Sequence, residues 1–518
     1  MWKDIIRKFK IALQGPSSLT RICLILSAYT LFIFNIPFFK EVFRAISSNL
    51  NGAWIVISMF IIMLALNFFI YYILLYLGRV VGKSIIALTM IGNAACLYFM
   101  VNFNVLIDRT MMGNVFVTNF SEASSFFSWT IIAYILLLGI PPCVWLFYKK
   151  INYGSIKRSL ANVGIALAII LGTVIGNKHN VLWIDYNATV LGSKIMPWSY
   201  IINSFRYFNH LKSQNVKEIR LPDAEFINDS KDICVLIIGE SARSKNFSLY
   251  GYKRKTNPLL ETDSVTVLKA KASDTYTTEA VKALLSYKPS DELYEILPNY
   301  LERNGVDVIW RTNNWGNPPL HIKKHYNANK LKERFPQFDE KGYDGLLFHN
   351  LKEEILACDS TKNKIFIGIH TYTSHGPQYH ASVPNKYKVF TPECKTVDLQ
   401  TAKQSELINA YDNTIVYTDH LVHSVIEMLK TEFPDRRSCV IFISDHGESL
   451  GEDGNYMHGI PKSMAPSEQI DIPFIVWTSD DAIKVKDMTA GHYNIYHSVL
   501  KFLGMNSPIY DESKNIFR

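Results

Sequence analysis

The first 180 residues are dominated by long apolar stretches that contain no charged side chain. Each stretch is about as long as a helix that crosses roughly 30 Å of hydrocarbon. Buried core helices would show a similar pattern, but five stretches within one block favour membrane spans. The predicted spans are Ile22–Phe39, Trp54–Gly78, Ser84–Ile107, Ala123–Tyr148 and Ser159–Asn177.

The basic residues between these stretches predict how the spans are oriented. Loops rich in Lys and Arg stay on the cytoplasmic side. The loop Asp108–Glu122 has Arg109 as its single basic residue and should face outward, whereas the loop with Lys40 and Arg44 fits less well. Five spans and an inner N-terminus place the C-terminal half outside, and the first stretch lacks the cleavage pattern of a signal peptide. The predicted cytoplasmic segments hold Lys3, Arg7, Lys8 and Lys10; Arg79 and Lys83; and Lys149, Lys150, Lys157 and Arg158.

From about residue 228 onward, short β-branched runs alternate with helix-like segments. Such alternation predicts an α/β domain with a mostly parallel sheet covered by helices on both faces. Predicted strands are Ile233–Ile238, Val306–Trp310, Lys364–Ile369, Val440–Ser444 and Pro473–Trp477. Predicted helices are Thr278–Ser286, Glu292–Asn304, Gly345–Cys358, Ser405–Lys430 and Tyr493–Gly504.

Three segments follow from this division of the chain. Residues 1–180 are predicted to form a multi-span α-helical membrane domain, and residues 228–518 an outward-facing α/β domain. Residues 181–227 are rich in Trp, Tyr and Phe, which favour the membrane–water interface. We interpret them as an interfacial linker; an ordinary amphipathic connector fits the pattern equally well.

Composition narrows the class further. Only 19% of the 518 residues are charged, against about 25% in soluble proteins. The net charge of +8 does not indicate a nucleic-acid partner, because many basic residues flank the apolar stretches and no nucleic-acid-binding motif is present. The seven cysteines do not form a disulfide framework. Only Cys358 and Cys394 lie in polar, loop-like sequence, where one bridge is compatible with the pattern.

Carboxylates and histidines gather where the predicted strands end. Glu240 follows the first strand, Asp445 and His446 follow a later one, and His370 ends another. Strand ends of a parallel sheet meet at one edge, and oxygen donors with an imidazole suit zinc, or less well manganese. A single histidine near a strand end is more often structural, but the set together predicts a metal site. The candidate site residues are Glu240, Asp445, His446, His375 and His458.

A nucleophile is expected close to such a metal. The segment Ser273–Glu279 precedes a predicted helix and contains three threonines. A coordinated metal can activate a hydroxyl, and a helix N-terminus binds phosphate. Threonines at this place also serve as N-caps. Spacing alone does not choose between Thr275, Thr277 and Thr278.

Several stretches resemble bacterial phosphoethanolamine transferases, a family within the alkaline phosphatase/sulfatase superfamily. The resemblance covers essentially the whole chain, the five spans included. Its most specific stretches are VLIIGESARSKNFSLYGY (235–252), INAYDNTI (408–415) and ISDHGESLGEDGNYMHGIP (443–461). Two weaker ones are RKTNPLL (254–260) and NVFVTNFSE (114–122).

The resemblance implies roles for single residues. Glu240, Asp445 and His446 match the zinc ligands of the family, and Thr277 matches its nucleophile, which also contacts zinc. Histidines that bind the phosphoryl group or a second metal match His375 and His458. Positions that contact substrate in the family match Asn114, Thr118 and Glu122 in the outward loop, and Asn313 or Asn314.

The resemblance also implies an activity. We expect a zinc enzyme with one or two metal ions that moves phosphoethanolamine from phosphatidylethanolamine to lipid A or the lipopolysaccharide core through a phosphothreonine-type intermediate. It would be a multi-pass protein of the bacterial inner membrane with its catalytic domain in the periplasm.

One departure from the family leaves the acceptor open. Members that modify lipid A usually carry cysteine and glycine around the nucleophile, but the loop ASDTYTTEAVKALLS (272–286) has neither and looks more like the branch that modifies the inner sugar core. The alternatives to this function are a glycerophosphate transferase similar to lipoteichoic acid synthase and a non-catalytic envelope lipid sensor. A sulfatase is disfavoured, because no C/S-x-P-x-R motif is present.

Overall fold

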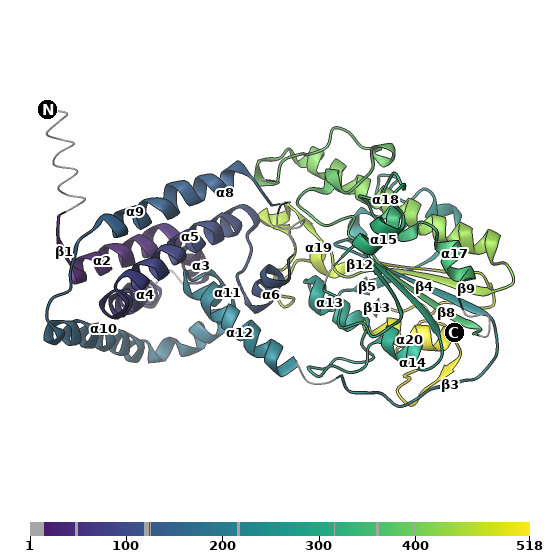
Figure 1. Cartoon of the computed structure of the whole chain (residues 1–518), viewed down its shortest axis with the longest axis horizontal. Coiled ribbons are helices and arrows are strands. Elements are labelled where there is room, and N and C mark those ends of the chain that lie inside the picture. Colours follow the sequence, from purple (N-terminus) through teal and green to yellow (C-terminus); the bar gives the residue numbers. More distant parts are fainter. Residues whose placement is uncertain are drawn as a thin grey trace. The chain divides into compact units, whose positions relative to one another are not determined.

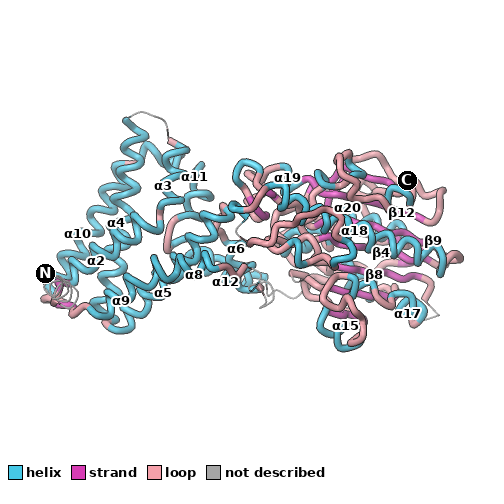
Figure 2. Tube along the Cα trace, turned by 90° about the horizontal axis from the view of Figure 1, so that it is seen from above, coloured by secondary structure: helices cyan, strands magenta, loops and turns pink. Residues whose placement is uncertain are grey.

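The computed structural model describes residues 15–46, 50–118, 124, 126–214, 218–314, 316–358, 362–397 and 399–518. It divides into two compact units: Met1–Gly113 with Phe127–Asn209, and Asn114–Phe126 with His210–Arg518. The first unit is built almost entirely of helices, and the large sheet belongs to the second (Figures 1 and 2). The fold class predicted from the sequence is therefore confirmed.

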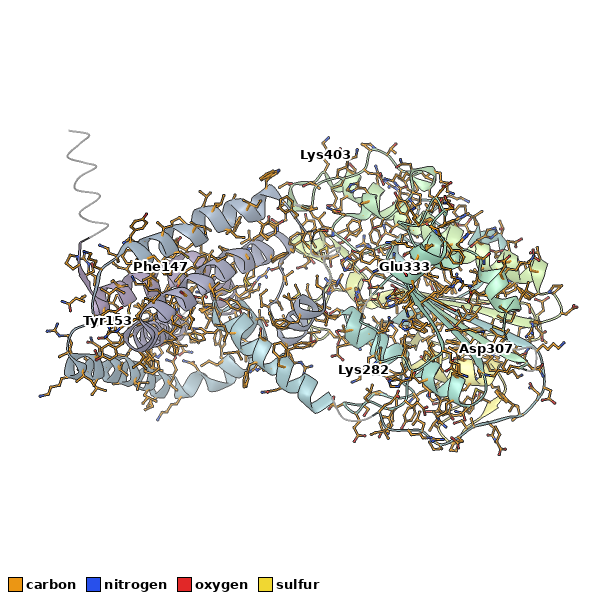
Figure 3. All side chains as sticks on the ribbon, in the orientation of Figure 1. Phe147, Tyr153, Lys282, Asp307, Glu333 and Lys403 are labelled. Carbon is orange, nitrogen blue, oxygen red and sulfur yellow. The ribbon has the colours of Figure 1, made fainter. Side chains whose placement is uncertain are left out.

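Four helices of the first unit are long and apolar enough to cross a membrane. Because a helix satisfies its backbone hydrogen bonds internally, it can be surrounded by lipid. Large apolar side chains lie on the outside of these helices, including Phe147, which is labelled in Figure 3 and is 47% exposed. The helices are α4 (Leu50–Gly78), α5 (Val80–Phe103), Trp129–Tyr148, which includes α8 (Trp129–Tyr134) and α9 (Ile140–Tyr148), and α10 (Ile156–Gly176).

The first predicted span is a bent pair of helices. α2 (Leu19–Tyr29) continues as a π-helical turn to Phe34, and α3 (Ile36–Ala45) then departs at 62°. Pro37 lies at the start of α3, and a proline cannot continue the hydrogen-bond ladder of the preceding helix. Within its described residues, the unit thus has four helices that are long and apolar enough to span a membrane, or five candidate spans if the bent pair forms one.

Residues 181–214, predicted as part of a linker, form helices α11 (Val181–Lys194) and α12 (Trp198–Gln214). Their junction is held by buried asparagines of the bundle, each of which accepts a hydrogen bond. The bonds run from Met196 N to Asn35 (2.7 Å), from Trp198 Nε1 to Asn67 (3.1 Å) and from Tyr200 OH to Asn93 (3.1 Å). This junction is therefore packed into the helical unit; a position at the membrane surface stays a prediction.

The second unit contains an eight-stranded sheet with the order β13-β5-β12-β9-β4-β8-β6-β7. Strands β9, β4, β8, β6 and β7 run parallel, whereas β12 is antiparallel to both of its neighbours. The sequence does not reveal this reversal, because a strand buried on both faces has the same apolar pattern in either direction. The strands are β4 (Asp232–Gly239), β5 (Thr266–Lys271), β6 (Asp307–Thr312), β7 (Lys324–Asn327), β8 (Lys364–His370), β9 (Arg437–Ser444), β12 (Asp471–Thr478) and β13 (Ala490–Gly491).

Helices cover both faces of this sheet (Figure 1). α14 and α20 pack on the face that carries Leu236 and Ile238, and α18 lies on the other side. One predicted helix is split in two, because Asn350 adopts a left-handed conformation (φ 55°) between α16 and α17. The helices are α13 (Thr277–Leu284), α14 (Leu297–Arg303), α15 (Ala328–Arg334), α16 (Gly345–Phe348), α17 (Leu351–Leu356), α18 (Gln404–Glu432), α19 (Ser467–Ile470) and α20 (Tyr493–Phe502).

The cysteines are free thiols in the described part of the chain, which contradicts the bridge considered between Cys358 and Cys394. The Cys358 thiol lies 3.4 Å from the Lys324 ammonium group. The Cys394 thiol instead contacts the carbonyl oxygen of Thr396 at 3.5 Å. Each thiol therefore contacts a different neighbouring group. Polar sequence around two cysteines was not sufficient to predict a disulfide bond between them.

Candidate metal centre

Two parallel neighbours in the sheet position the carboxylates of the site. β4 and β9 run side by side in register, with Gly239 opposite Ser444. The next residue of each strand is a buried carboxylate, Glu240 after β4 and Asp445 after β9. Since parallel strands end at the same edge, the two side chains meet there. The expected convergence of Glu240 and Asp445 is thus present in the structure.

His446 faces these carboxylates with a nitrogen that carries no proton. Its Nδ1 lies 3.0 Å from the carbonyl oxygen of Gly447 and donates to it, so Nε2 has the lone pair. That Nε2 is 3.3 Å from Asp445 Oδ2 and 3.6 Å from Glu240 Oε1. The carboxylates of Glu240 and Asp445 and Nε2 of His446 therefore point their lone pairs at one another, and no positive charge of the described residues lies between them.

Thr277 brings a hydroxyl to the same place. It is the first residue of α13 and is buried. Its Oγ1 lies 3.4 Å from Glu240 Oε2 and 3.3 Å from His446 Nε2. Thr275, in contrast, donates to the carbonyl oxygen of Ile460 at 2.7 Å. Of the candidate threonines, Thr277 is the one whose hydroxyl contacts the candidate metal ligands.

The donor set fits a zinc ion. Asp445 Oδ2 accepts no hydrogen bond from the described residues, although it is fully buried. A buried carboxylate oxygen without a proton donor is costly unless a cation binds it. Two carboxylates, an imidazole and a hydroxyl are also ligand types that zinc takes in proteins.

The pKa shifts at this site also favour the binding of a cation. Burial, with the nearby Asp445 charge, raises the pKa of Glu240 to about 8. Burial likewise raises the pKa of Asp445 to about 7 and lowers that of His446 to about 4. Without a cation, the site thus resists holding both carboxylates in the charged form at neutral pH.

The turn that presents Glu240 is held by α18. Ser241, directly after Glu240, has a left-handed backbone (φ 53°), which is rare for a residue with a side chain. The Tyr411 hydroxyl donates to the carbonyl oxygen of Ser241 at 2.7 Å and accepts from the backbone N–H of Arg243 at 3.0 Å. Tyr411 belongs to the stretch INAYDNTI, so this stretch supports the turn.

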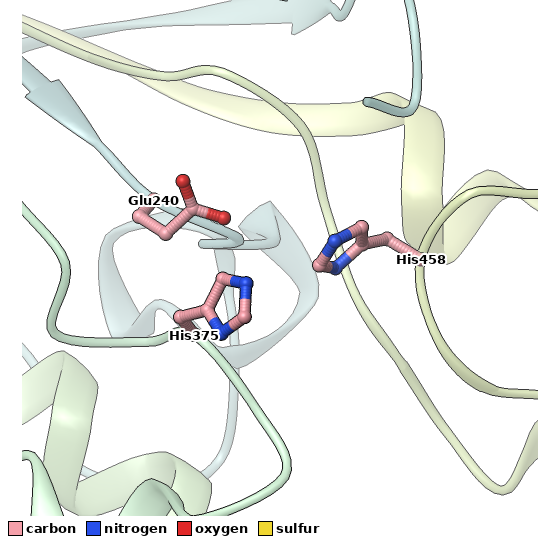
Figure 4. A group of neighbouring side chains, drawn as sticks. All are labelled: Glu240, His375 and His458. Carbon is pink, nitrogen blue, oxygen red and sulfur yellow. The ribbon is translucent and has the colours of Figure 1, made fainter. Parts of the chain in front are cut away.

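A second cluster lies beside the first. Glu240, His375 and His458 present ligand atoms that all lie within 4.8 Å of one another, and Figure 4 shows these side chains around a common space. The His458 Nδ1 is 3.3 Å from Ser241 Oγ and 3.3 Å from Glu448 Oε1. This arrangement could hold a second cation or an anionic oxygen of a substrate.

The two asparagines of the stretch WRTNN (310–314) have different surroundings. Asn314 Nδ2 donates to Glu240 Oε2 at 2.6 Å and so orients a candidate metal ligand. Asn313 Nδ2 instead donates to the buried carboxylate of Asp344 at 2.8 Å. Asn314 is therefore the one in contact with the candidate metal centre.

Of the remaining candidate residues, Asn114 lies in α6 (Arg109–Val117) and Thr118 directly follows this helix. Asn114 and Thr118 are one helical turn apart, and the Thr118 hydroxyl donates to the carbonyl oxygen of Asn114 at 2.7 Å. Glu122 lies outside the described residues. A substrate-facing role of these three residues stays a prediction.

Sequence reasoning did not select two buried residues of this site. Glu448 follows Asp445 and His446 in one run, and burial raises its pKa to about 8. His370 ends β8, and one of its ring nitrogens lies within 4.8 Å of carboxylate oxygens of Glu240 and Asp445. Their proximity in sequence to the selected residues was the available signal.

Comparisons with known proteins agree with this geometry. Residues 233–505 match the family model "Sulfatase", and residues 62–211 match the model "Phosphoethanolamine transferase EptA/EptB". The chain is 35% identical to Phosphoethanolamine transferase EptA of Helicobacter pylori over 80% of this chain and 81% of that protein. It is 29% identical to the Escherichia coli K12 protein of the same name, over 98% of both chains.

A solved structure supports the same assignment over both units. The integral membrane protein lipooligosaccharide phosphoethanolamine transferase A (EptA) of Neisseria meningitidis matches with a TM-score of 0.86 and 25% identity, covering 97% of this chain and 98% of that one. Shared sequence and shared architecture thus extend over the helical unit and the α/β unit. The chain belongs to the phosphoethanolamine transferase family, within the alkaline phosphatase/sulfatase superfamily, and is an enzyme of this class.

Proposed function

We propose that this enzyme transfers phosphoethanolamine from phosphatidylethanolamine to a lipopolysaccharide acceptor, either lipid A or the sugar core, through a covalent intermediate on Thr277. The single observation that carries the proposal is the position of Thr277 Oγ1, which lies within 3.4 Å of both Glu240 and His446. A hydroxyl in contact with a buried set of metal ligands is the arrangement that a phosphoryl-transfer nucleophile requires.

Glu240, Asp445, His446 and Thr277 would hold one zinc ion, and His375 and His458 would hold a second ion or the phosphoryl group. A bound zinc ion would lower the pKa of the Thr277 hydroxyl and neutralise negative charge on the phosphoryl oxygens. The support for this assignment is the unpaired Asp445 Oδ2 and the proton-free Nε2 of His446.

The chain's own residues perform the transfer in two steps. Thr277 Oγ1 loses its proton and forms a bond to the phosphorus of the donor, the phosphorus–glycerol bond breaks, and diacylglycerol leaves after taking up a proton. Phosphoethanolamine then stays on Thr277. A hydroxyl oxygen of the acceptor then bonds to the same phosphorus, the bond between Thr277 Oγ1 and phosphorus breaks, and the proton lost by the acceptor restores the Thr277 hydroxyl. His458 and His375 line the approach to Glu240 and are the residues that would contact phosphoryl oxygens or carry protons.

The membrane domain presents the lipid donor. Residues 1–180 would form the transmembrane domain, residues 181–227 the connection and residues 228–518 the periplasmic catalytic domain of a multi-pass inner-membrane protein. A lipid held at fixed depth has a high effective concentration at the site. Asn313 and the segment with Asn114, Thr118 and Glu122 are proposed as further substrate contacts.

Two parts of lipopolysaccharide, lipid A and the sugar core, are candidate acceptors. The Neisseria meningitidis relative is named for lipooligosaccharide, which supports a lipopolysaccharide-type acceptor. The loop 272–286, without cysteine and glycine, favours the sugar core instead. Supplying purified lipid A and heptose-containing core oligosaccharide side by side separates the two, since only the true acceptor gains phosphoethanolamine.

The covalent step is tested with Thr277→Ala, and Thr278→Ala serves as the control for the neighbouring hydroxyl. The full-length proteins in detergent receive zinc and fluorescent phosphatidylethanolamine. We expect wild type and Thr278→Ala to release fluorescent diacylglycerol and to gain the mass of phosphoethanolamine, mapped to Thr277. Thr277→Ala should do neither while it keeps its fold. Undiminished release by Thr277→Ala would contradict the proposal.

The same assay decides between the alternatives. Release from phosphatidylglycerol but not from phosphatidylethanolamine would indicate a glycerophosphate transferase. Release from neither lipid, in a protein that binds no zinc, would favour a non-catalytic lipid sensor. The buried set of Glu240, Thr277, Asp445 and His446 is the observation that favours an active enzyme over such a sensor.

A further inference from the structure

The loop formed by residues 272–276 leads from β5 to α13 and so determines where Thr277 lies. Two hydrogen bonds to other parts of the domain hold the middle of this β5–α13 loop. The backbone N–H of Ser273 donates to Nδ1 of His492 at 3.2 Å, and the Thr275 hydroxyl donates to a main-chain carbonyl oxygen at 2.7 Å. The first of these bonds comes from a histidine that the proposed mechanism does not use.

The hydrogen bonds of His492 define the state of its ring. The side chain directly follows β13 and is completely buried. Because a backbone N–H only donates, Nδ1 accepts the bond from Ser273 and carries the lone pair. The proton is then on Nε2, which lies 3.1 Å from the carbonyl oxygen of Ser444 and donates to it. Burial lowers the pKa of His492 to about 4, so the neutral ring that this pattern requires is the stable form at neutral pH.

The partner on Nε2 belongs to the part of the sheet that presents the candidate metal ligands. Ser444 is the last residue of β9 and directly precedes Asp445. Its hydroxyl accepts from the backbone N–H of Ala242, in the turn after β4, and donates to the carbonyl oxygen of His446, each at 2.8 Å. Ser444 thus connects the ends of β4 and β9, and His492 connects both to the β5–α13 loop.

We infer that His492 is a positioning residue for the transfer reaction: its imidazole holds the β5–α13 loop against the end of β9 and so sets where Thr277 Oγ1 lies relative to the candidate metal centre. This inference rests on the proposed function, in which Thr277 is the nucleophile. His492 contacts none of the candidate metal ligand atoms in the hydrogen bonds described above, so its loss should slow the attack and leave the binding of lipid and zinc unchanged.

α20 supplies a matched control for a buried histidine. His497 shows the same bonding pattern as His492 and is also buried. Its Nδ1 accepts from the backbone N–H of Asp511 at 3.1 Å, and its Nε2 lies 2.7 Å from the carbonyl oxygen of Tyr287. Neither partner belongs to the β5–α13 loop or to the ends of β4 and β9. Comparing the two histidines therefore separates loss of a buried imidazole from loss of the contact with the loop.

The test compares His492→Gln with His497→Gln in the full-length, zinc-loaded protein in detergent. Glutamine can place an amide N–H near the position of Nε2 but leaves no acceptor at the position of Nδ1. The rate at which phosphoethanolamine appears on Thr277 is measured in a single turnover at rising concentrations of fluorescent phosphatidylethanolamine, together with zinc content and thermal transition. At saturating lipid, His492→Gln should react about a hundredfold more slowly, the loss that a misplacement of about 1 Å can cause.

The other readouts distinguish positioning from a merely structural role. His492→Gln should keep the zinc content of wild type and the lipid concentration that gives half-maximal rate. His497→Gln should lower the thermal transition but react at the rate of wild type. Equal rates of wild type and His492→Gln would overturn the inference alone, as would an equal loss of rate in both variants. Loss of zinc from folded His492→Gln would also overturn it, because the imidazole would then act through the metal ligands.

Two further outcomes are decided by the same assay. A wild type that gains no phosphoethanolamine on Thr277 would overturn the proposed function and the inference with it. If His492→Gln does not fold, His492→Asn is compared with His492→Leu, because the asparagine amide oxygen can replace Nδ1 as the acceptor for Ser273 and leucine cannot. His492→Asn should react faster than His492→Leu, and equal rates of these two variants would contradict the positioning role.

Discussion

Strands β4, β8 and β9 carry ionisable side chains at both of their ends, and the two ends differ in how their charges are balanced. At the start of β4, Asp232 is completely buried and is paired with two cations. Lys364 at the start of β8 lies 2.6 Å from Asp232 Oδ2, and Arg437 at the start of β9 lies 2.8 Å from the same oxygen. Asn228 and Ser230 accept further hydrogen bonds from Lys364.

At the other ends of these strands the described residues supply no such cation. Glu240, Asp445 and His446 converge with their lone pairs toward one another, and Asp445 Oδ2 has no proton donor among the described residues. Burial of a charge is tolerated where a counter-charge accompanies it. The difference indicates a structural role for the Asp232 end and supports the proposal that the Glu240 end binds an ion and a substrate from outside the chain.

Asp445→Asn should abolish zinc binding at the Glu240 end of the strands and give the largest loss of transfer activity. The variant keeps the size of the side chain but removes one charge that the proposed zinc requires. Because metal-bound charge stabilises the transition state by several kcal/mol, we expect kcat/KM to fall by about a thousandfold or more. Bound zinc, measured by mass spectrometry of the metal, should fall as well. Near-normal turnover without zinc would contradict the account.

Asp232→Ala should instead lower the stability of the domain at the opposite end of the strands. It leaves Lys364 and Arg437 without their carboxylate, and removal of one partner from a buried ion pair costs about 3–5 kcal/mol. The thermal transition of the catalytic domain should therefore fall, while the zinc content of the folded protein stays that of wild type. Loss of zinc from protein that is still folded would show that the two ends are not separate in function.

Asn314→Ala tests whether a hydrogen bond to Glu240 supports metal binding at the Glu240 end of the strands. It removes the 2.6 Å hydrogen bond to Glu240 Oε2, and loss of such a supporting bond typically weakens metal binding by about 10–100-fold. Asn313→Ala is the matched control for zinc affinity, because Asn313 bonds to Asp344 rather than to Glu240. Equal zinc affinities in the two variants would argue against a supporting role of Asn314.

The smallest expected effect concerns pH. In the metal-free protein, the pKa values of Glu240 and Asp445 are raised to about 8 and about 7 from 4.5 and 3.8. The folded state then binds more protons than the unfolded state, so stability falls as pH rises from 6.5 to 8. Each proton contributes at most about 1.4 kcal/mol per pH unit. The pKa of His446 is lowered to about 4 from 6.5, so protonation of His446 affects stability only below about pH 6.5.

Calorimetry of the metal-free and zinc-loaded full-length protein across pH 6.5–8 measures this effect. Zinc should raise the transition temperature more at pH 8 than at pH 6.5, because it binds the ionised carboxylates. Asp445→Asn should reduce the pH dependence of the metal-free protein. A metal-free protein that becomes more stable between these pH values would contradict the buried, unpaired state of Glu240 and Asp445.

Much of the fold was predictable because its signals are local. Each long apolar stretch predicts a spanning helix by itself. The strands β4 (Asp232–Gly239) and β9 (Arg437–Ser444) are visible in the sequence as continuous runs of apolar residues. The bend at Pro37, the antiparallel direction of β12 and the split at Asn350 were missed. These depend on packing or on a single backbone conformation, to which hydrophobic periodicity is insensitive.

The candidate site was predictable where its residues follow strands. Glu240, Asp445 and His446 could be expected together from strand ends alone, whereas Thr277 was singled out by family resemblance and by its contacts. Asn313 bonds to Asp344 and Asn314 to Glu240, a difference in partners that one sequence does not reveal. His370 ends a predicted strand and Glu448 lies in the stretch 443–461, but only their burial and contacts show that they belong to the site.

Anomalous X-ray diffraction at the zinc absorption edge, on crystals of the zinc-loaded full-length enzyme, tests the central claim most directly. We predict a strong peak bounded by Glu240, Asp445 and His446, next to Thr277 Oγ1, and none beside Asp232, Lys364 and Arg437. No peak at the first place, in protein that transfers phosphoethanolamine, would contradict the claim that this end of the sheet is completed by a metal ion.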